Sequence, residues 1–377
     1  MRYTDSILDA LRLQGDPSAD ALMHELIEHG EVEHVSELLG SLLRSDTVIP
    51  SDFPARVQAW LHANSHLPDG VDTEKMVRAA AHFAKHAFSY AVVLSTSSLL
   101  EAYAARRGVE VLTFTHRLDY DTKRRIAETT QFYLNVQSPH VFEEGGQGIA
   151  NILKIRLLHA TVRNLILGSK RWDIEDRGIP VCQEDMLGTM LTFSGVIIRD
   201  LPKLGITLTA EQAEDLLYYW CVVGQVLGVD PTWMPRSVED ATVLGERIAE
   251  RHHEPSESGR RMAASLMEFM QSMMPAHLFN SMVPVLLRTM AGDNVCDILG
   301  LPEHHFQHVS KSDYLVREFL IPLNLVGRSL LAGGAMVLNG GHRSKFTLPT
   351  SLDANFETHH AGWRDAVYAL MTYMHQQ

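Results

Sequence analysis

Apolar residues recur with the period of an α-helix through nearly the whole chain, and this pattern limits the fold more than any other feature. Strict alternation of apolar and polar residues over the length of a β-strand is almost absent. The first pattern predicts amphipathic helices, whereas half-buried strands need the second. We therefore expect an all-α protein.

The helical segments follow one another without a fixed-period repeat or a low-complexity tract. The 377 residues are enough for one large domain or two ordinary ones. We expect a single large helical domain in residues 71–377, with residues 1–70 as an N-terminal helical extension packed on it. Residues 109–115 are expected to be a short extended connection. His252 and His253 lie among polar residues and are expected to be solvated.

The chain carries 46 acidic and 33 basic residues, a formal net charge of −13. Nucleic-acid binding needs clustered Lys and Arg, so this balance argues against it. The first residues hold no apolar segment of the secretory kind, which favours a cytoplasmic location. The most apolar stretch, 87–104, contains hydroxyl side chains and Glu101, so it is expected to be a buried helix and not a membrane span. The sequence does not indicate an oligomeric state.

A strongly apolar helix is expected over residues 151–167, between a capping Asn and a terminating Gly. Its polar exceptions include Arg156, His159 and Arg163, at positions i, i+3 and i+7. At roughly 100° per residue, these three fall within about 60° of one another on one face. The helix therefore carries two guanidiniums and one imidazole along a single stripe that the apolar surroundings predict to be buried.

A buried guanidinium is rarely found without an anion, because an unpaired charge in a low-dielectric interior costs several kcal/mol. Two interpretations are open. In the first, a haem supplies two propionates for the arginines and takes His159 as the axial ligand of its iron. In the second, Arg156 and Arg163 pair with Asp or Glu from neighbouring helices, and His159 is a hydrogen-bonded core histidine. Spacing alone favours the second. A haem here would be non-covalent haem b, because the chain has no Cys-x-x-Cys-His.

Four short motifs then follow one another in an order that is typical of one enzyme family. They are Ala-Ala-Arg-Arg-Gly-Val-Glu-Val-Leu at 104–112, Arg-Ile-Ala-Glu-Thr at 125–129, Arg-Leu-Leu-His-Ala-Thr-Val-Arg at 156–163 and Ile-Pro-Val-Cys-Gln-Glu-Asp-Met-Leu-Gly-Thr at 179–189. Through this series the chain resembles the rubber-oxygenase (latex-clearing) and MpaB-type oxygenase family. Two further stretches, 226–235 and 291–302, also resemble it.

Members of that family are all-helical, with a globin-like core around a non-covalent b haem, and they oxidise isoprenoid double bonds with dioxygen. The resemblance implies the same fold and an oxygenase that takes O2 and a hydrophobic small molecule of unsaturated or isoprenoid character. It implies that His159 is the proximal iron ligand. It also implies that residues of these motifs hold or flank the haem, namely Arg125, Thr129, Arg156, Arg163 and, from a weaker match, Arg288.

The chain departs from the latex-clearing pattern in one place, because Glu128 stands where those proteins have a lysine beside the distal threonine. A carboxylate there is able to act as a general base for an allylic proton, to bind iron weakly, or to pair with an arginine. Glu110 is a second candidate base by the resemblance, and the alternative for it is a solvated loop carboxylate. A distal site closed by a side chain such as Glu128 would instead make the chain a non-catalytic haem-binding protein, a gas or redox sensor or carrier.

Overall fold

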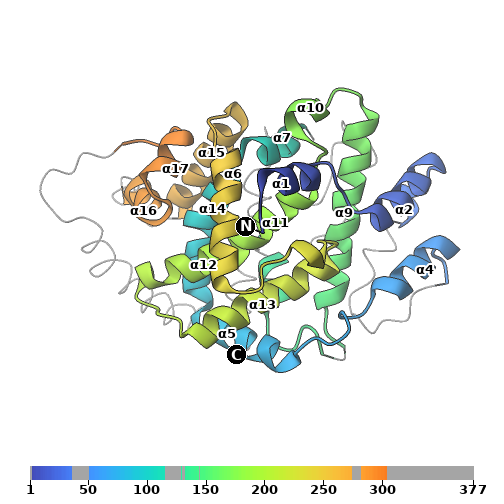
Figure 1. The fold of residues 1–377 in the computed structure, drawn as a ribbon, viewed down its shortest axis with the longest axis horizontal. Helices are drawn as coiled ribbons and strands as arrows, with labels where there is room; N and C mark the ends of the chain where they lie inside the picture. The colour runs from blue at the N-terminus through green and yellow to red at the C-terminus, as the bar shows by residue number, and fades with distance from the viewer. Residues whose placement is uncertain are drawn as a thin grey trace, which may run out of the picture.

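The computed structural model describes residues 2–35, 51–114, 129, 132–143, 145–273 and 282–303. Within these ranges the protein is built of helices (Figure 1). The one extended pairing in the same ranges is an isolated bridge between Ala105 and His253. The predicted all-α fold is confirmed.

The N-terminal part contains α1 (Asp5–Arg12), α2 (Pro17–Glu28) and α4 (Ala55–Asn64). Asp16 caps α2, since its carboxylate accepts the N–H of Ala19 at 3.3 Å. Pro17 stands in the first turn, where its missing N–H leaves no helical hydrogen bond unmade. Leu8 and Leu26 are fully buried in the main hydrophobic core, so this part packs on the rest of the protein. The boundary at residue 70 stays a prediction.

One long helical run consists of α5 (Thr73–Val93), the π-helical turn η1 (Leu94–Ser98) and α6 (Leu99–Ala104). α5 packs along α13 (Ala210–Val226). Arg78 fixes this pair of helices, because two of its nitrogens donate to the buried carboxylate of Asp215 at 2.7 and 2.9 Å. α13 starts at a capping box in which Thr209 and Gln212 each satisfy a backbone N–H of the other.

The next part of the chain contains α9 (Gly148–Gly168), α10 (Ile174–Arg177), α11 (Gln183–Phe193), α12 (Gly195–Asp200) and η2 (Leu201–Leu204). α9 begins at Gly148, earlier than the expected cap at Asn151. The N–H of Gly148 donates to the carbonyl of Val141 at 2.8 Å. A Cβ at Gly148 would lie 2.7 Å from the ring of Phe142, so glycine lets the preceding loop fold back onto the start of the helix.

The last described elements are η3 (Pro231–Trp233), α14 (Val238–His252), α15 (Glu257–Met273), α16 (Met282–Ala291) and α17 (Asp293–Ile298). α15 packs against α7 (Arg106–Phe114). The expected extended connection is therefore wrong over residues 109–114, which are helical. Burial explains the difference, because Val109 packs in a second core and Val111 packs with Ile166, and this packing outweighs the strand preference of valine.

The buried apolar side chains form a main core and a smaller second core. The main core takes residues mainly from α1, α2, α4, α5, α9 and α11 to α14. The second core is formed by α6, α7, α15, α16 and α17. In the part of the chain that the structure describes, no helix has the length and apolar content that a membrane span needs.

Candidate functional site

α9 carries the stripe on which the sequence places the candidate site, and other helices cover it. α2 lies against it (Figure 1). Ile152, Leu157 and Ala160 of α9 are completely buried, as its apolar sequence predicts. The polar side chains of the stripe therefore find their partners inside the protein.

Arg156 is bound on all three of its nitrogens. Nε and Nη2 donate to the two carboxylate oxygens of Asp16 at 2.5 and 3.0 Å, which is a bidentate pair. Nη1 donates to Oδ1 of Asn64 at 2.8 Å and to the carbonyl of Val226 at 3.3 Å. The guanidinium also lies 5.3 Å from the ring centroid of Trp60, within cation–π range.

Arg163 is also bound on all three nitrogens and is only 2% exposed. Nη1 pairs with the carboxylate of Asp20. Nε donates to the carbonyl of Pro180 at 3.0 Å and Nη2 to that of Val181 at 2.7 Å. Burial raises the pKa of Asp20, and the pairing with Arg163 acts against that shift. Each arginine thus has its own carboxylate, and both carboxylates come from the start of α2.

His159 lies between the two arginines along α9 and makes a different set of contacts. Burial, together with the nearby Arg163, lowers the pKa of its imidazole to about 4, while Asp16 acts in the opposite direction. The ring is therefore neutral near pH 7. Its Nδ1 is buried without a hydrogen-bond partner among the described residues, although the side chain keeps some accessible surface. A neutral imidazole with an unpaired nitrogen is able to bind a metal ion.

The structure thus separates the two interpretations of the stripe by residue. For Arg156 and Arg163 it supports pairing with acidic residues of a neighbouring helix. For His159 it does not provide the hydrogen bond that a core histidine was expected to make at Nδ1. Sequence reasoning missed Asp16 and Asp20. The pair Asp-Pro at 16–17 signals a helix start, but no local pattern connects it with an arginine 140 residues later.

The distal motif lies mostly outside the described residues. Arg125 and Glu128 are not among them, and Thr129 is helical and half-buried. One turn later, Tyr133 stacks on Trp220 of α13 with ring centroids 5.0 Å apart, so the helix over 132–137 packs in the main core. The roles of Arg125, Glu128 and Thr129 stay predictions.

Glu110 lies on α7 and is half-buried, so it is not a solvated loop carboxylate. Its Oε1 accepts a hydrogen bond from Oγ of Ser258 at 3.3 Å, and Oε2 lies 4.0 Å from Nη1 of Arg177. Ser258 lies on α15 and Arg177 on α10, so neither of these partners belongs to α9. Its role as a base stays a prediction.

Arg288 lies in the last turn of α16 and binds residues that follow the helix. Its guanidinium binds the carboxylates of Asp293 at 3.0 Å and Asp297 at 2.7 Å. It also donates to the carbonyls of Leu301 and Pro302. These contacts stabilise the turn around α17, and its expected part in a haem site stays a prediction.

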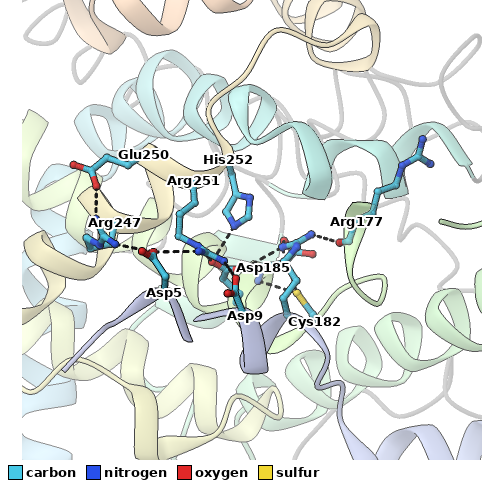
Figure 2. A network of polar contacts seen from close by, with 11 residues as sticks. Asp5, Asp9, Arg177, Cys182, Asp185, Arg247, Glu250, Arg251 and His252 are labelled. Atoms are coloured by element: carbon cyan, nitrogen blue, oxygen red, sulfur yellow. Dashed lines mark hydrogen bonds and ion pairs between the residues drawn. The ribbon is translucent and has the colours of Figure 1, made fainter. Parts of the chain in front are cut away.

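A second buried polar set lies at the N-terminal end of α11, and we call it the Glu184 cluster (Figure 2). It consists of Arg12, Glu184, Asp185, Arg251 and His252. Glu184 is 1% exposed, and its Oε1 lies 2.8 Å from Nε of Arg251 and 2.9 Å from Nε2 of His252. Arg12 donates to Oδ1 of Asp185 at 2.7 Å.

The Glu184 cluster corrects one expectation. His252 is 3% exposed and not solvated, because the carboxylate of Glu184 approaches it from α11. Burial by itself would raise the pKa of Glu184. The contacts with His252, Arg251 and Arg12 outweigh burial, and the pKa of Glu184 lies below its ordinary value.

Comparison with known proteins now decides the family. Residues 83–313, well over half of the chain, match the family described as ER-bound oxygenase mpaB/B'/Rubber oxygenase, catalytic domain. The chain belongs to this oxygenase family. A rubber oxygenase of Streptomyces sp. (strain K30) is 23% identical over 288 residues, which are 76% of this chain and 70% of that protein.

The solved structure of latex clearing protein in the closed state has the same fold as this oxygenase. The TM-score is 0.73 at 21% identity, and the likeness covers 97% of this chain and 91% of that chain. The family match begins at residue 83, so it includes α9 but neither α1 nor α2. The two carboxylates that bind Arg156 and Arg163 therefore lie before the matched catalytic domain.

Proposed function

We propose that this oxygenase holds a haem b on His159 and uses dioxygen to oxidise a hydrophobic small molecule of unsaturated or isoprenoid character. The observation that carries the proposal is the state of His159, a neutral imidazole inside the protein whose buried Nδ1 has no described hydrogen-bond partner. Leaving a buried polar atom unpaired costs roughly 1 to 3 kcal/mol, so such an atom indicates a missing partner.

His159 fits an iron ligand in its charge. A metal binds the neutral form of histidine, and the lowered pKa of His159 keeps the ring in that form. When bound, the haem supplies the iron at which dioxygen reacts. The chain's own residues would hold that iron, orient the ring that binds it and keep the surroundings apolar.

Arg156 and Arg163 support this site by holding the helix that carries His159. They stand one turn before and one turn after it on the same face. Every nitrogen of both guanidiniums already has an acceptor within the protein. We therefore assign to them the positioning of α9.

The motif at 125–129 supplies the further residues of the proposed site. Arg125 and Thr129 would flank the haem, and Glu128 would accept a proton from the carbon next to the oxidised double bond. Glu110 is the alternative proton acceptor. Arg288 would support the haem site through a weaker match to the family motif.

The haem is tested first, by the ultraviolet–visible spectrum of the purified protein, oxidised and dithionite-reduced, with a pyridine haemochrome assay. The wild type is expected to show a b-type Soret band, and His159→Ala is expected to lack it. A wild type without the band after reconstitution with haem would overturn the proposal.

The oxygenase reaction is tested next with an oxygen electrode and a spectrum of the ferrous protein. Oxygen uptake is expected with isoprenoid alkenes and not with the corresponding saturated hydrocarbons. A ferrous haem that stays six-coordinate and ignores dioxygen would contradict turnover and would favour a non-catalytic haem-binding protein.

A further inference from the structure

We propose that Asp16 and Asp20 are positioning residues of the site, acting as a clamp of two carboxylates that fixes the face of α9 carrying His159. The proposal rests on the proposed function, because the orientation of this face of α9 affects activity only if His159 binds the haem. Both residues lie before the matched catalytic domain, which begins at residue 83. The N-terminal segment would therefore be a working part of the oxygenase.

The first half of the clamp is the pair of Asp16 and Arg156. Both carboxylate oxygens are used, at 2.5 and 3.0 Å, and Asn64 takes the remaining nitrogen at 2.8 Å. Two parallel hydrogen bonds fix the orientation of a guanidinium as well as its position. A single ion pair through one nitrogen would allow the side chain to rotate.

Two glycines show that the backbone is built closely around both pairs. A Cβ on Gly15 would lie 2.6 Å from Oδ2 of Asp20 and 2.9 Å from Nε of Arg163. A Cβ on Gly228 would lie 2.3 Å from Oδ2 of Asp16, and the φ of +95° at Gly228 also favours glycine. Any side chain at either position would push the carboxylate away from its arginine.

The chain between α1 and α2 is itself held in place by Gln183. The side-chain Nε2 donates to the carbonyls of Gly15 at 2.7 Å and Gly228 at 2.9 Å. Its Oε1 accepts the N–H of Asp230 at 2.8 Å, and its backbone N–H donates to the carbonyl of Gln14 at 2.8 Å. The carboxylates of the clamp are thus attached to α11 and to the loop after α13, and not only to α2.

The clamp also sets the charge beside His159. Two guanidiniums flank the imidazole, and two carboxylates balance them. Without Asp16, the guanidinium of Arg156 would lack its countercharge in a low-dielectric region near His159. Its positive charge would then weaken the binding of a positively charged iron to His159. Residues that hydrogen-bond a metal-ligating histidine typically change metal affinity or activity by about 10- to 100-fold. The clamp acts on His159 through the two arginines, one step farther from the metal, so we expect an effect near the lower end of that range.

The experiment compares Asp16→Asn and Asp20→Asn with Asp9→Asn in the full chain. Asp9 is a matched control, because it stands on the same N-terminal segment and pairs with Arg251 at 2.6 Å, away from α9. The first readout is hydrogen–deuterium exchange of the haem-free protein in peptides covering 150–165. The second is the rate at which haem transfers to apomyoglobin.

Both clamp variants are expected to speed exchange in α9 and to release haem about tenfold faster or more, whereas Asp9→Asn changes neither. Asn64→Ala keeps both carboxylates and is expected to give a smaller effect of the same kind. It serves as the folded variant if Asp16→Asn does not fold. Asp16→Glu is expected to restore part of the haem retention.

The outcomes separate the clamp from the proposed function. A wild-type protein that takes up no haem would contradict the proposed function. In that case the hydrogen–deuterium exchange data alone would decide whether the clamp holds α9. Faster exchange with unchanged haem release would make the two carboxylates merely structural and would overturn the positioning role. Clamp variants that behave like Asp9→Asn in both readouts would overturn the clamp as a whole.

Discussion

His159 and His252 are both enclosed by protein, and each has an arginine beside it, yet their polar surroundings differ. His252 lies 2.9 Å from a carboxylate oxygen of Glu184, which Arg251 and Arg12 also contact. Among the described residues no carboxylate forms an ion pair with His159, and Asp16 and Asp20 are paired with Arg156 and Arg163. The pKa of His159 falls to about 4. The Nδ1 atoms of both rings are buried without a hydrogen-bond partner among the described residues, so the carboxylate beside His252 is what distinguishes the two sites.

The comparison teaches that burial alone does not mark a metal ligand. A buried histidine in contact with a carboxylate of an ionic cluster already has a partner within the protein. A buried histidine that is neutral and lacks a partner is a cost to the fold until a ligand takes its free nitrogen. If the two histidines differ in this way, substitutions beside them should have different consequences.

The largest effect is expected on haem binding. His159→Ala should abolish the b-type Soret band, since it removes the proposed iron ligand, whereas His252→Ala should keep it. Both variants are compared by haemochrome assay after identical reconstitution, with far-ultraviolet circular dichroism to check that each is folded. A folded His252→Ala protein without haem would show that the two histidines do not differ as the structure indicates.

The second-largest effect is expected on the stability of the protein, through the Glu184 cluster. Glu184→Gln should lower the free energy of unfolding by about 3 kcal/mol, because Arg12 and Arg251 lose a buried countercharge. Urea unfolding measures it, with Asp9→Asn as the control, since Asp9 is largely exposed and should contribute less than about 1 kcal/mol. Equal losses in the two variants would mean that the Glu184 cluster behaves as an ordinary surface ion pair.

The third test follows the same carboxylate with pH. The pKa of Glu184 in the folded protein lies below its ordinary value of 4.5. Its stabilisation is therefore complete above that value and is lost as the pH falls through 4.5 toward the folded-state pKa. The difference in the urea midpoint of unfolding between the wild type and Glu184→Gln should become smaller from pH 7 to pH 3. A difference that stays constant would contradict the lowered pKa.

The sequence predicted the helical fold and the stripe of Arg156, His159 and Arg163, because both follow from periodicity along one segment. It could not predict Asp16 and Asp20 as partners, since that contact depends on how α2 packs on α9. The same limit explains the wrong expectation for His252. A polar local sequence indicates solvent, but Glu184 approaches it from another helix.

The resemblance to the family motifs predicted different properties from those that periodicity predicted. It predicted the family, which the comparison with known proteins confirmed. It also predicted His159 as the iron ligand, and that role stays a prediction. It also singled out Glu110 and Arg288, whose described contacts lie in other parts of the fold. A motif records which residues recur together in a family, whereas the distances between them come only from the packed helices.

The smallest effect is a difference between two conservative substitutions, one beside each histidine. Arg163 uses three nitrogens for one carboxylate and two backbone carbonyls in fixed directions. The partners of Arg251 among the described residues are all carboxylates, those of Asp5, Asp9 and Glu184. A single ammonium is able to approach carboxylates with less exact geometry. Arg163→Lys should therefore cost about 1 kcal/mol more than Arg251→Lys, since each buried hydrogen bond left unmade costs roughly that amount. Urea midpoints at constant m-value measure the difference. Equal costs would mean that the carbonyls of Pro180 and Val181 add nothing to the hold on α9, and that charge alone binds α2 to this helix.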